Sequence, residues 1–146
     1  MTRIITALSE ISSPYEALFV DLWGCVHDGV RALPEAVAAL QAYRAGGGIV
    51  VLLTNSPKPR AGVEVQLDHF GVPRDAWDTI ATSGDSARAA MFRGAVGERI
   101  FFIGEDRDMP FFEPIKVVED PVTITLTKLD EATGIVCTGP FDPAAD

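Results

Sequence analysis

The sequence predicts an α/β fold with a parallel sheet, and three observations lead to this prediction. Two apolar runs, residues 17–21 and 48–56, end in polar residues, as is typical of buried strands that lead into loops. The segment between them, residues 33–45, has apolar side chains at helical spacing, and Pro34 suits the first turn of a helix. A strand, a helix and a second strand form a βαβ unit, so the two strands are expected to be parallel.

The elements of the first part follow from the same patterns. The first strand is expected over Ala17–Asp21. The first helix is expected over Pro34–Ala45, because the glycines Gly46–Gly48 end it and open the second strand. The second helix is expected over Pro59–Phe70, since its apolar residues recur at helical spacing and Gly71 follows as its cap.

A third strand, Thr79–Thr82, and a further helix, Asp85–Phe92, precede a glycine-bounded junction at residues 94–97. Beyond this junction, short apolar or alternating segments predict several strands and one helical piece. The strands are expected over Arg99–Ile103, Ile115–Val118, Val122–Thr127 and Ile135–Thr138, and the helical piece near Met109–Phe112.

The distribution of charge supports a division at the junction. Residues 1–94 contain 8 basic and 10 acidic side chains, whereas residues 95–146 contain 4 and 11. We therefore expect two domains, residues 1–96 and residues 97–146. The net charge of −9 repels nucleic acid and anionic membrane surfaces, so no nucleic-acid partner is expected.

Hydropathy and cysteine content indicate a cytoplasmic protein. The mean hydropathy of +0.19 fits either a sheet buried on both faces or apolar surface meant for a missing partner. No apolar run approaches the roughly eighteen residues of a membrane helix. We therefore expect no membrane partner. Polar residues interrupt the amino-terminal segment, which argues against a signal peptide. Cys25 and Cys137 are expected to stay reduced.

Polar residues at the ends of the first two strands predict a phosphate site. Asp21 ends the first strand and Thr54 the second, at the edge where open α/β sheets bind ligands. An aspartate there can attack phosphorus, a threonine can donate a hydrogen bond to a phosphate oxygen, and Gly24 lets backbone amides approach. The alternative is structural: Asp21 caps a turn, and the polar residues 54–56 cap the next helix.

Two motifs resemble those of the haloacid dehalogenase-like superfamily. Asp-Leu-Trp-Gly-Cys-Val-His-Asp-Gly, residues 21–29, resembles motif I, and Leu-Leu-Thr-Asn-Ser, residues 52–56, resembles motif II. Segments 80–86 and 100–105 resemble the third strand and the first cap strand of class IIA, the branch of NagD-like sugar phosphatases and p-nitrophenyl phosphatases. The resemblance covers nearly the whole chain. It implies a three-layer Rossmann-like core with a parallel sheet, followed by the beginning of an α/β C2-type cap.

The resemblance also implies an activity and a set of site residues. It implies a magnesium-dependent phosphatase that acts on a small phosphorylated substrate, such as a sugar phosphate, through an aspartyl phosphate at Asp21. Mg²⁺ would be bound by the Asp21 carboxylate and the Trp23 carbonyl. The residues expected to bind the phosphoryl group are Leu22, Trp23, Gly24, Thr54, Asn55 and Lys58.

One departure from the family pattern concerns proton transfer. The family's phosphatases usually carry an acid/base aspartate two residues after the nucleophile, where this chain has Trp23. An indole cannot protonate a leaving alkoxide, and the loss of a general acid typically costs roughly 10²–10⁴-fold in rate. Asp28 or His27 would have to reach back over the loop, whereas we expect His27 to be an ordinary loop residue. Trp23 is expected to pack the loop or to screen the site from water.

The second departure is length. In the family, a lysine and further acidic residues that hold magnesium come from strands after the cap, so we expect this sequence to be the first half of a longer protein. Without a neighbour from the second half, Leu18–Val20 would form an exposed apolar edge, which favours pairing with another copy of the chain. A homo-oligomer that covers this edge is therefore expected.

Three functional hypotheses remain open. The first is the phosphatase described above. The second is a non-catalytic module that binds a phosphorylated ligand or a protein partner. The third is a phosphotransferase, or an enzyme that cleaves a bond whose leaving group needs no proton.

Overall fold

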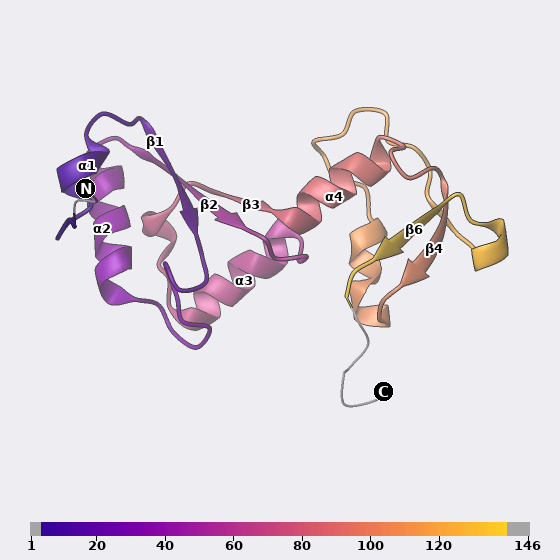
Figure 1. Ribbon diagram of the computed structural model, residues 1–146, viewed down its shortest axis with the longest axis horizontal. Helices are drawn as coiled ribbons and strands as arrows, with labels where there is room; N and C mark the ends of the chain where they lie inside the picture. Colours follow the sequence, from indigo (N-terminus) through magenta and orange to yellow (C-terminus); the bar gives the residue numbers. More distant parts are fainter. Residues whose placement is uncertain (1–3, 140–146) are drawn as a thin grey trace. The chain divides into compact units, whose positions relative to one another are not determined.

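The computed structural model describes residues 4–139, which form two compact units (Figure 1). The first unit comprises the chain up to residue 55 together with residues 60–82. The second comprises residues 56–59 and the chain from residue 83 onward. Helix α4 (Ser83–Phe92) thus belongs to the second unit by its contacts, whereas the division at residue 96 groups it with the first part.

The first unit is built on a three-stranded parallel sheet in the order β1-β2-β3, which confirms the predicted fold class. The strands are β1 (Ala17–Asp21), β2 (Ile49–Thr54) and β3 (Thr79–Thr82). The register pairs Asp21 with Leu53, so the carboxyl ends of β1 and β2 lie at the same edge of the sheet.

Two helices connect these strands. Helix α2 (Pro34–Ala45) begins with a proline, whose missing N–H would have no partner in the first turn of a helix, and it ends at Gly46. Helix α3 (Arg60–Phe70) links β2 to β3 through a short helical turn, η1 (Arg74–Ala76), and a four-residue helix, α1 (Ser9–Ser12), precedes β1. Right-handed crossovers between neighbouring strands place α2 and α3 on the same face of the sheet.

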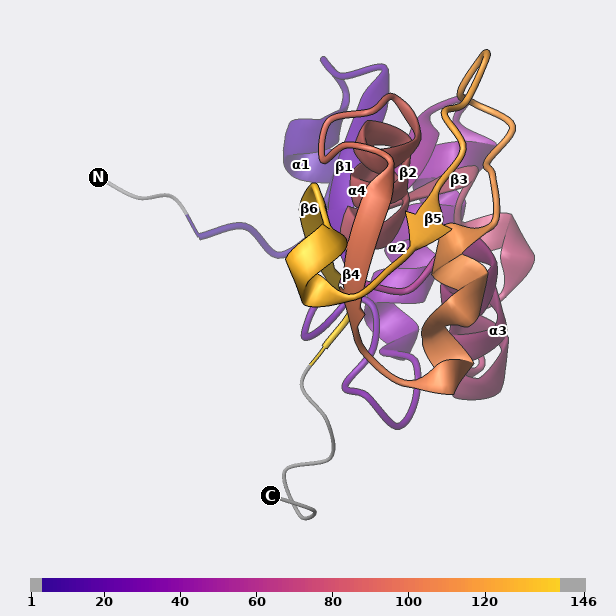
Figure 2. The same cartoon turned by 90° about the vertical axis from the view of Figure 1, so that its right-hand side faces the viewer.

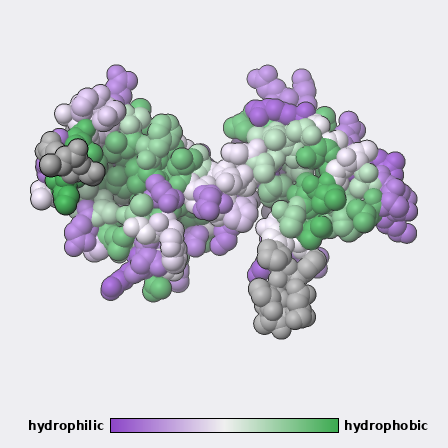
Figure 3. Space-filling model, viewed as in Figure 1, coloured by the Kyte–Doolittle hydropathy of each residue, from purple (hydrophilic) through white to green (hydrophobic). Residues whose placement is uncertain are grey.

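The two faces of β2 differ accordingly. Val50 and Leu52 are fully buried in a core that they share with residues of α2 and α3, whereas Ile49 and Leu53, which alternate with them, are about half exposed. On β1, an edge strand of this sheet, Phe19 is 71% exposed. Figure 3 shows apolar residues gathered over the part of the first unit where β1 lies. The described chain thus leaves an apolar edge uncovered.

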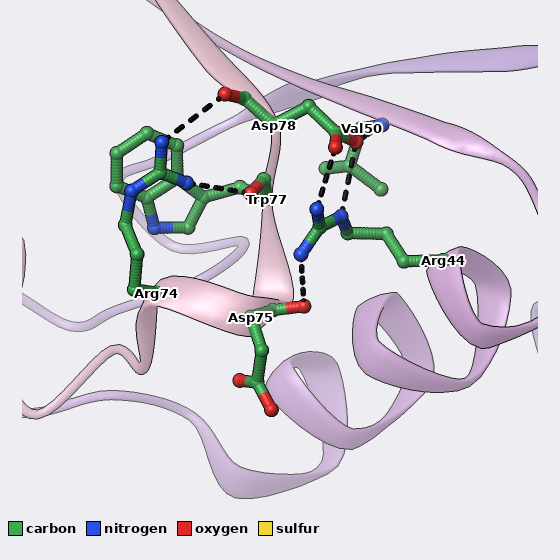
Figure 4. Close-up of polar contacts among 6 residues, drawn as sticks. All are labelled: Arg44, Val50, Arg74, Asp75, Trp77 and Asp78. Carbon is green, nitrogen blue, oxygen red and sulfur yellow. Dashed lines mark hydrogen bonds and ion pairs between the residues drawn. The ribbon is translucent and has the colours of Figure 1, made fainter.

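An ion pair fastens the amino ends of the strands to α2 (Figure 4). The guanidinium of Arg44 donates to both carboxylate oxygens of Asp78, at 3.0 and 2.6 Å, and to the carbonyl oxygen of Asp75. The same carboxylate accepts a 2.7 Å hydrogen bond from the buried Val50 amide. Asp78 therefore joins α2, β2 and the start of β3 at the edge of the sheet opposite to Asp21.

The second unit contains a small parallel sheet with β4 between β5 and β6 (Figure 2). Aromatic and aliphatic side chains of α4 and of the following loops form its core. Its elements after α4 are β4 (Arg99–Ile103), η2 (Asp106–Phe112), β5 (Thr125–Leu126), η3 (Leu129–Glu131) and β6 (Gly134–Cys137).

Two strand predictions in this unit were wrong in whole or in part. Segment 115–118 contains a turn rather than a strand, because prolines flank the region and Val118 is drawn into the core. Of the strand expected over Val122–Thr127, only Thr125–Leu126 pairs with β4, since the Val122 amide donates instead to the carbonyl of Phe92 at the end of α4. Among the described helices, none is long and apolar enough to cross a membrane.

Candidate active site

Asp21 is the last residue of β1, and its carboxylate is exposed at the carboxyl edge of the sheet. One carboxylate oxygen, Oδ1, accepts a 2.8 Å hydrogen bond from the amide of Leu22. Within the described part of the chain, the other oxygen has no hydrogen-bond donor. The carboxylate is thus held at one oxygen and open at the other, an arrangement suited to a nucleophile.

The loop that follows β1 is folded tightly upon itself. The amides of Cys25, Val26 and His27 all donate to the carbonyl of Leu22, at 3.2, 2.8 and 3.2 Å. The Gly24 amide donates in return to the His27 carbonyl at 2.8 Å. Gly24 has a φ of 75°, a backbone conformation that residues other than glycine rarely adopt. Leu22 and Val26 are buried and anchor the loop to the core.

This folding affects the three amides that were expected to hold a phosphoryl group. The Leu22 amide already donates to Asp21 and the Gly24 amide to His27. Of the three, only the Trp23 amide lacks an acceptor among the described residues. Among the described residues, the loop therefore offers one N–H without an acceptor, that of Trp23, two residues after Asp21.

The Trp23 side chain lies over its own loop. It is 68% exposed, its ring meets the His27 ring edge-on at a centroid distance of 6.0 Å, and it covers Gly29 closely. A Cβ atom at Gly29 would lie 2.0 Å from the nearest ring carbon, and Gly29 has a φ of 90°. Gly29 is the last residue of the motif I segment, and its contact with Trp23 was not predicted from the sequence.

His27 and Asp28, the two residues considered as substitutes for the absent acid, both have structural partners. His27 is buried against Phe70, with ring centroids 4.7 Å apart, and its Nδ1 accepts a 3.1 Å hydrogen bond from the Gly29 amide. Burial lowers the pKa of His27, and the carboxylates of Asp28 and Asp21 oppose this shift only in part. The prediction that His27 has no special catalytic role stays a prediction, but its geometry is that of a packed loop residue.

The Asp28 carboxylate accepts hydrogen bonds from the amides of Val30 and Arg31, both at 2.9 Å. The Arg31 and Val30 amides together lower the pKa of Asp28, so it stays ionised at neutral pH. It is therefore a turn-capping carboxylate rather than a proton donor.

The second group of expected site residues lies after β2. Thr54 ends the strand and is half-buried, and Asn55 is exposed just beyond it. Lys58 belongs to segment 56–59 of the second unit, where its amide donates to the Ser56 hydroxyl at 3.2 Å. Helix α3 begins only at Arg60, so Asn55 and Ser56 lie in the loop between β2 and α3 rather than in the first turn of the helix.

A close backbone contact fixes this segment within the second unit. The Gly84 amide donates to the Ser56 carbonyl at 3.1 Å, and a Cβ atom at Gly84 would lie 2.1 Å from the Pro57 carbonyl oxygen. Only glycine fits there without movement of the backbone. The sequence placed Gly84 in a motif-like segment but gave no sign of this role.

The described residues supply few ligands for a metal. The Asp21 carboxylate and the Trp23 carbonyl are the two oxygen donors expected from the sequence, and no group of three or more His, Cys, Asp or Glu side chains converges anywhere in residues 4–139. Magnesium requires near-octahedral coordination by six oxygens, of which water commonly supplies several. The donor set of these residues alone does not make a magnesium site.

A groove of about 1080 Å³ lies elsewhere in the first unit, lined by residues of α1, α2 and the glycine turn before β2. Its lining includes Ile49 at the amino end of β2 but neither Asp21 nor Thr54. It is therefore separate from the candidate site.

Comparisons with known proteins agree with this architecture. The family model for haloacid dehalogenase-like hydrolases matches residues 18–116. The crystal structure of a hydrolase of the haloacid dehalogenase-like family from Brucella suis 1330 is 38% identical, with a TM-score of 0.82, and the match covers 98% of this chain and 49% of that one. The chain thus spans about half the length of this solved relative, and no curated protein matches it. On the family model and this relative together, the chain belongs to the haloacid dehalogenase-like hydrolase family.

Proposed function

We propose that the protein is a phosphatase of small phosphorylated metabolites in which Asp21 is the nucleophile. The observation that supports this most directly is the exposed Asp21 carboxylate at the carboxyl edge of the sheet, with one oxygen held by the Leu22 amide. Ligands bind at this edge in open α/β sheets, and the family consists of hydrolases.

In this mechanism, the open oxygen of Asp21 attacks phosphorus and forms an aspartyl phosphate while the bond to the leaving group breaks. The Trp23 amide and the Thr54 hydroxyl at the end of the neighbouring strand hold phosphoryl oxygens, with Asn55 of the same unit as a further candidate. Water then attacks phosphorus, the bond to Asp21 breaks, and the carboxylate is regenerated with release of phosphate.

Within the family, we assign the protein to class IIA on motifs I and II, and we infer that the natural protein continues beyond residue 146. The coverage of only 49% of the Brucella suis hydrolase supports this inference. We also infer that a bound Mg²⁺, for which Asp21 and Trp23 would supply two oxygen ligands, would offset the charge of nucleophile and phosphate, and that the protein is cytoplasmic. The intact mass of the protein from its natural source tests whether the chain continues beyond residue 146. A mass about twice that of this chain supports the inference, and an equal mass contradicts it.

Substitution of the nucleophile tests the phosphatase activity. We expect the protein to hydrolyse p-nitrophenyl phosphate, and Asp21→Asn to abolish turnover. The matched control is Asp68→Asn, which removes an exposed carboxylate from α3 and should leave the rate unchanged. Chelation with EDTA should stop the reaction and added Mg²⁺ should restore it. Activity that survives in Asp21→Asn would contradict the proposal.

A second candidate function is a non-catalytic module that binds a phosphorylated ligand, and the specific observation in its favour is the absence of an acid at Trp23. Titration of the Asp21→Asn variant with inorganic phosphate distinguishes the two. A binding module with no turnover should keep or gain affinity for phosphate in this variant, since a negative charge beside the ligand is removed.

A further inference from the structure

The loop after Asp21 contains the side chains that we consider as proton donors to a leaving group at the proposed nucleophile. At the position two residues after Asp21, where the family's phosphatases carry an acid, the Trp23 ring is held across Gly29. An indole N–H is a hydrogen-bond donor but does not release its proton near neutral pH. Trp23 therefore occupies this position without supplying a proton.

The two neighbouring candidates are excluded by their geometry. His27 is only 5% exposed, and its Nδ1 is engaged by the Gly29 amide while its ring packs on Phe70. To reach a leaving group over Asp21, it would have to leave the core and abandon this hydrogen bond.

The carboxylate of Asp28 is similarly engaged. It accepts two backbone hydrogen bonds, at 2.9 Å each, and lies 3.5 Å from the guanidinium of Arg31. A rotation toward Asp21 would leave the amides of Val30 and Arg31 without this acceptor. The one other titratable side chain between residues 22 and 29 is the exposed thiol of Cys25.

From this arrangement we propose that the site selects phosphorylated substrates whose leaving group departs as a stable anion, such as acyl phosphates and phenolic phosphates. The inference rests on the proposed phosphatase function and narrows its substrate class, since sugar phosphates and other alkyl phosphates release an alkoxide that needs a proton. Trp23 thereby determines substrate specificity, because its indole cannot donate a proton to the leaving group.

The chemical step balances without a general acid. The Asp21 carboxylate forms a bond to phosphorus, the bond from phosphorus to the leaving oxygen breaks, and the leaving group takes the electron pair and departs as a carboxylate or phenolate. Water then forms a bond to phosphorus, the bond to Asp21 breaks, and hydrogen phosphate and a proton pass into solvent.

A series of substrates that differ in leaving-group pKa tests the proposal on the protein as its natural source produces it. Acetyl phosphate, p-nitrophenyl phosphate, phenyl phosphate and glycerol phosphate span leaving groups from a carboxylic acid, with a pKa of about 4, through a phenol at about 10, to an alcohol beyond it. We expect kcat/KM to fall by roughly 10²–10⁴-fold between the first two substrates and glycerol phosphate, the factor that a general acid typically supplies.

Three variants sharpen the test, each checked for folding by its circular dichroism spectrum. Trp23→Asp introduces an acid and should raise kcat/KM for glycerol phosphate far more than for acetyl phosphate. Trp23→Phe keeps an aromatic ring without an acid and should retain the steep dependence on leaving group, and Cys25→Ser, which removes the thiol, should do the same.

The outcomes distinguish the substrate preference from the phosphatase function. If all four substrates react at similar rates, or if Cys25→Ser alone steepens the dependence, a proton donor exists and the leaving-group proposal is wrong while the phosphatase function stands. If no substrate is hydrolysed, the phosphatase function itself is wrong and the leaving-group proposal fails with it.

Discussion

Substitution of Gly29 by alanine tests whether the Trp23 ring is held across the loop of the candidate site. The added Cβ would lie 2.0 and 2.4 Å from two carbons of the ring, so the ring must move. Gly24 provides a matched comparison in the same loop, because it also has a positive φ, of 75°, yet nothing lies within 4 Å of a Cβ there.

The geometry gives the expected magnitudes. Gly24→Ala should lower the free energy of unfolding by about 1–2 kcal/mol, the cost of the left-handed conformation alone. Gly29→Ala should add a packing cost of about 1–3 kcal/mol, and the lower part of that range is expected because the ring belongs to an exposed side chain that can swing away. In a Trp23→Ala background the packing cost disappears, so Gly29→Ala should then cost only about 1–2 kcal/mol.

The assay is urea unfolding of the four proteins of this double-mutant cycle and of Gly24→Ala, followed by circular dichroism. The emission of Trp77, which is 1% exposed in the core of the first unit, reports on that unit in the Trp23→Ala proteins. If Gly29→Ala costs no more than Gly24→Ala, or costs the same with and without Trp23, the ring is not held over Gly29.

Three further predictions concern stability and assembly. Because burial depresses the pKa of His27, the folded state binds fewer protons than the unfolded state just below pH 6.5. The free energy of unfolding should therefore be highest above pH 6.5 and should fall as the pH drops toward the lowered pKa. In urea unfolding, His27→Asn should remove this fall and the control His69→Gln should preserve it. The hydrogen bond from Arg44 lowers the pKa of Asp78, so the stabilisation by this carboxylate is present above about pH 4 and is lost in acid. Asp78→Asn should therefore lower the melting temperature at pH 7, whereas Asp68→Asn should not. Equal melting temperatures would contradict a stabilising role for the ion pair in Figure 4. The exposed edge at β1 should make the 146-residue chain self-associate, and Phe19→Lys should reduce its mass in light scattering; a cooperatively folding monomer would contradict this prediction.

The elements of the first unit were predictable because their signals are local. The bounds of β1, α2 and β3 agree with the sequence pattern, since apolar runs, a proline and a glycine turn mark them within a few residues. The second unit was less predictable. Segment 122–127 alternates well enough for a strand, but the bond from Val122 to the end of α4 is a contact across about thirty residues that alternation does not encode.

The candidate site shows the same division between local and non-local information. The placement of Asp21 and Thr54 at one edge of the sheet followed from the parallel βαβ unit alone. The position of the Trp23 ring over Gly29 and the burial of His27 against Phe70 depend on side-chain orientation and on α3, and neither leaves a periodic signal. The second glycine of motif I was the one available hint, and it was compatible with any tight turn.

The structure of this loop also bears on the choice between catalysis and binding. Its amides at Leu22 and Gly24 are engaged within the described chain, so a phosphoryl group bound at the proposed site would meet one open N–H, that of Trp23, and the Asp21 carboxylate, which repels it. A site that served only to bind phosphate would gain nothing from that carboxylate, because like charges at contact distance oppose each other. An exposed Asp21 is costly for a protein that only binds phosphate and necessary for a nucleophile, and for this reason we propose catalysis rather than binding alone.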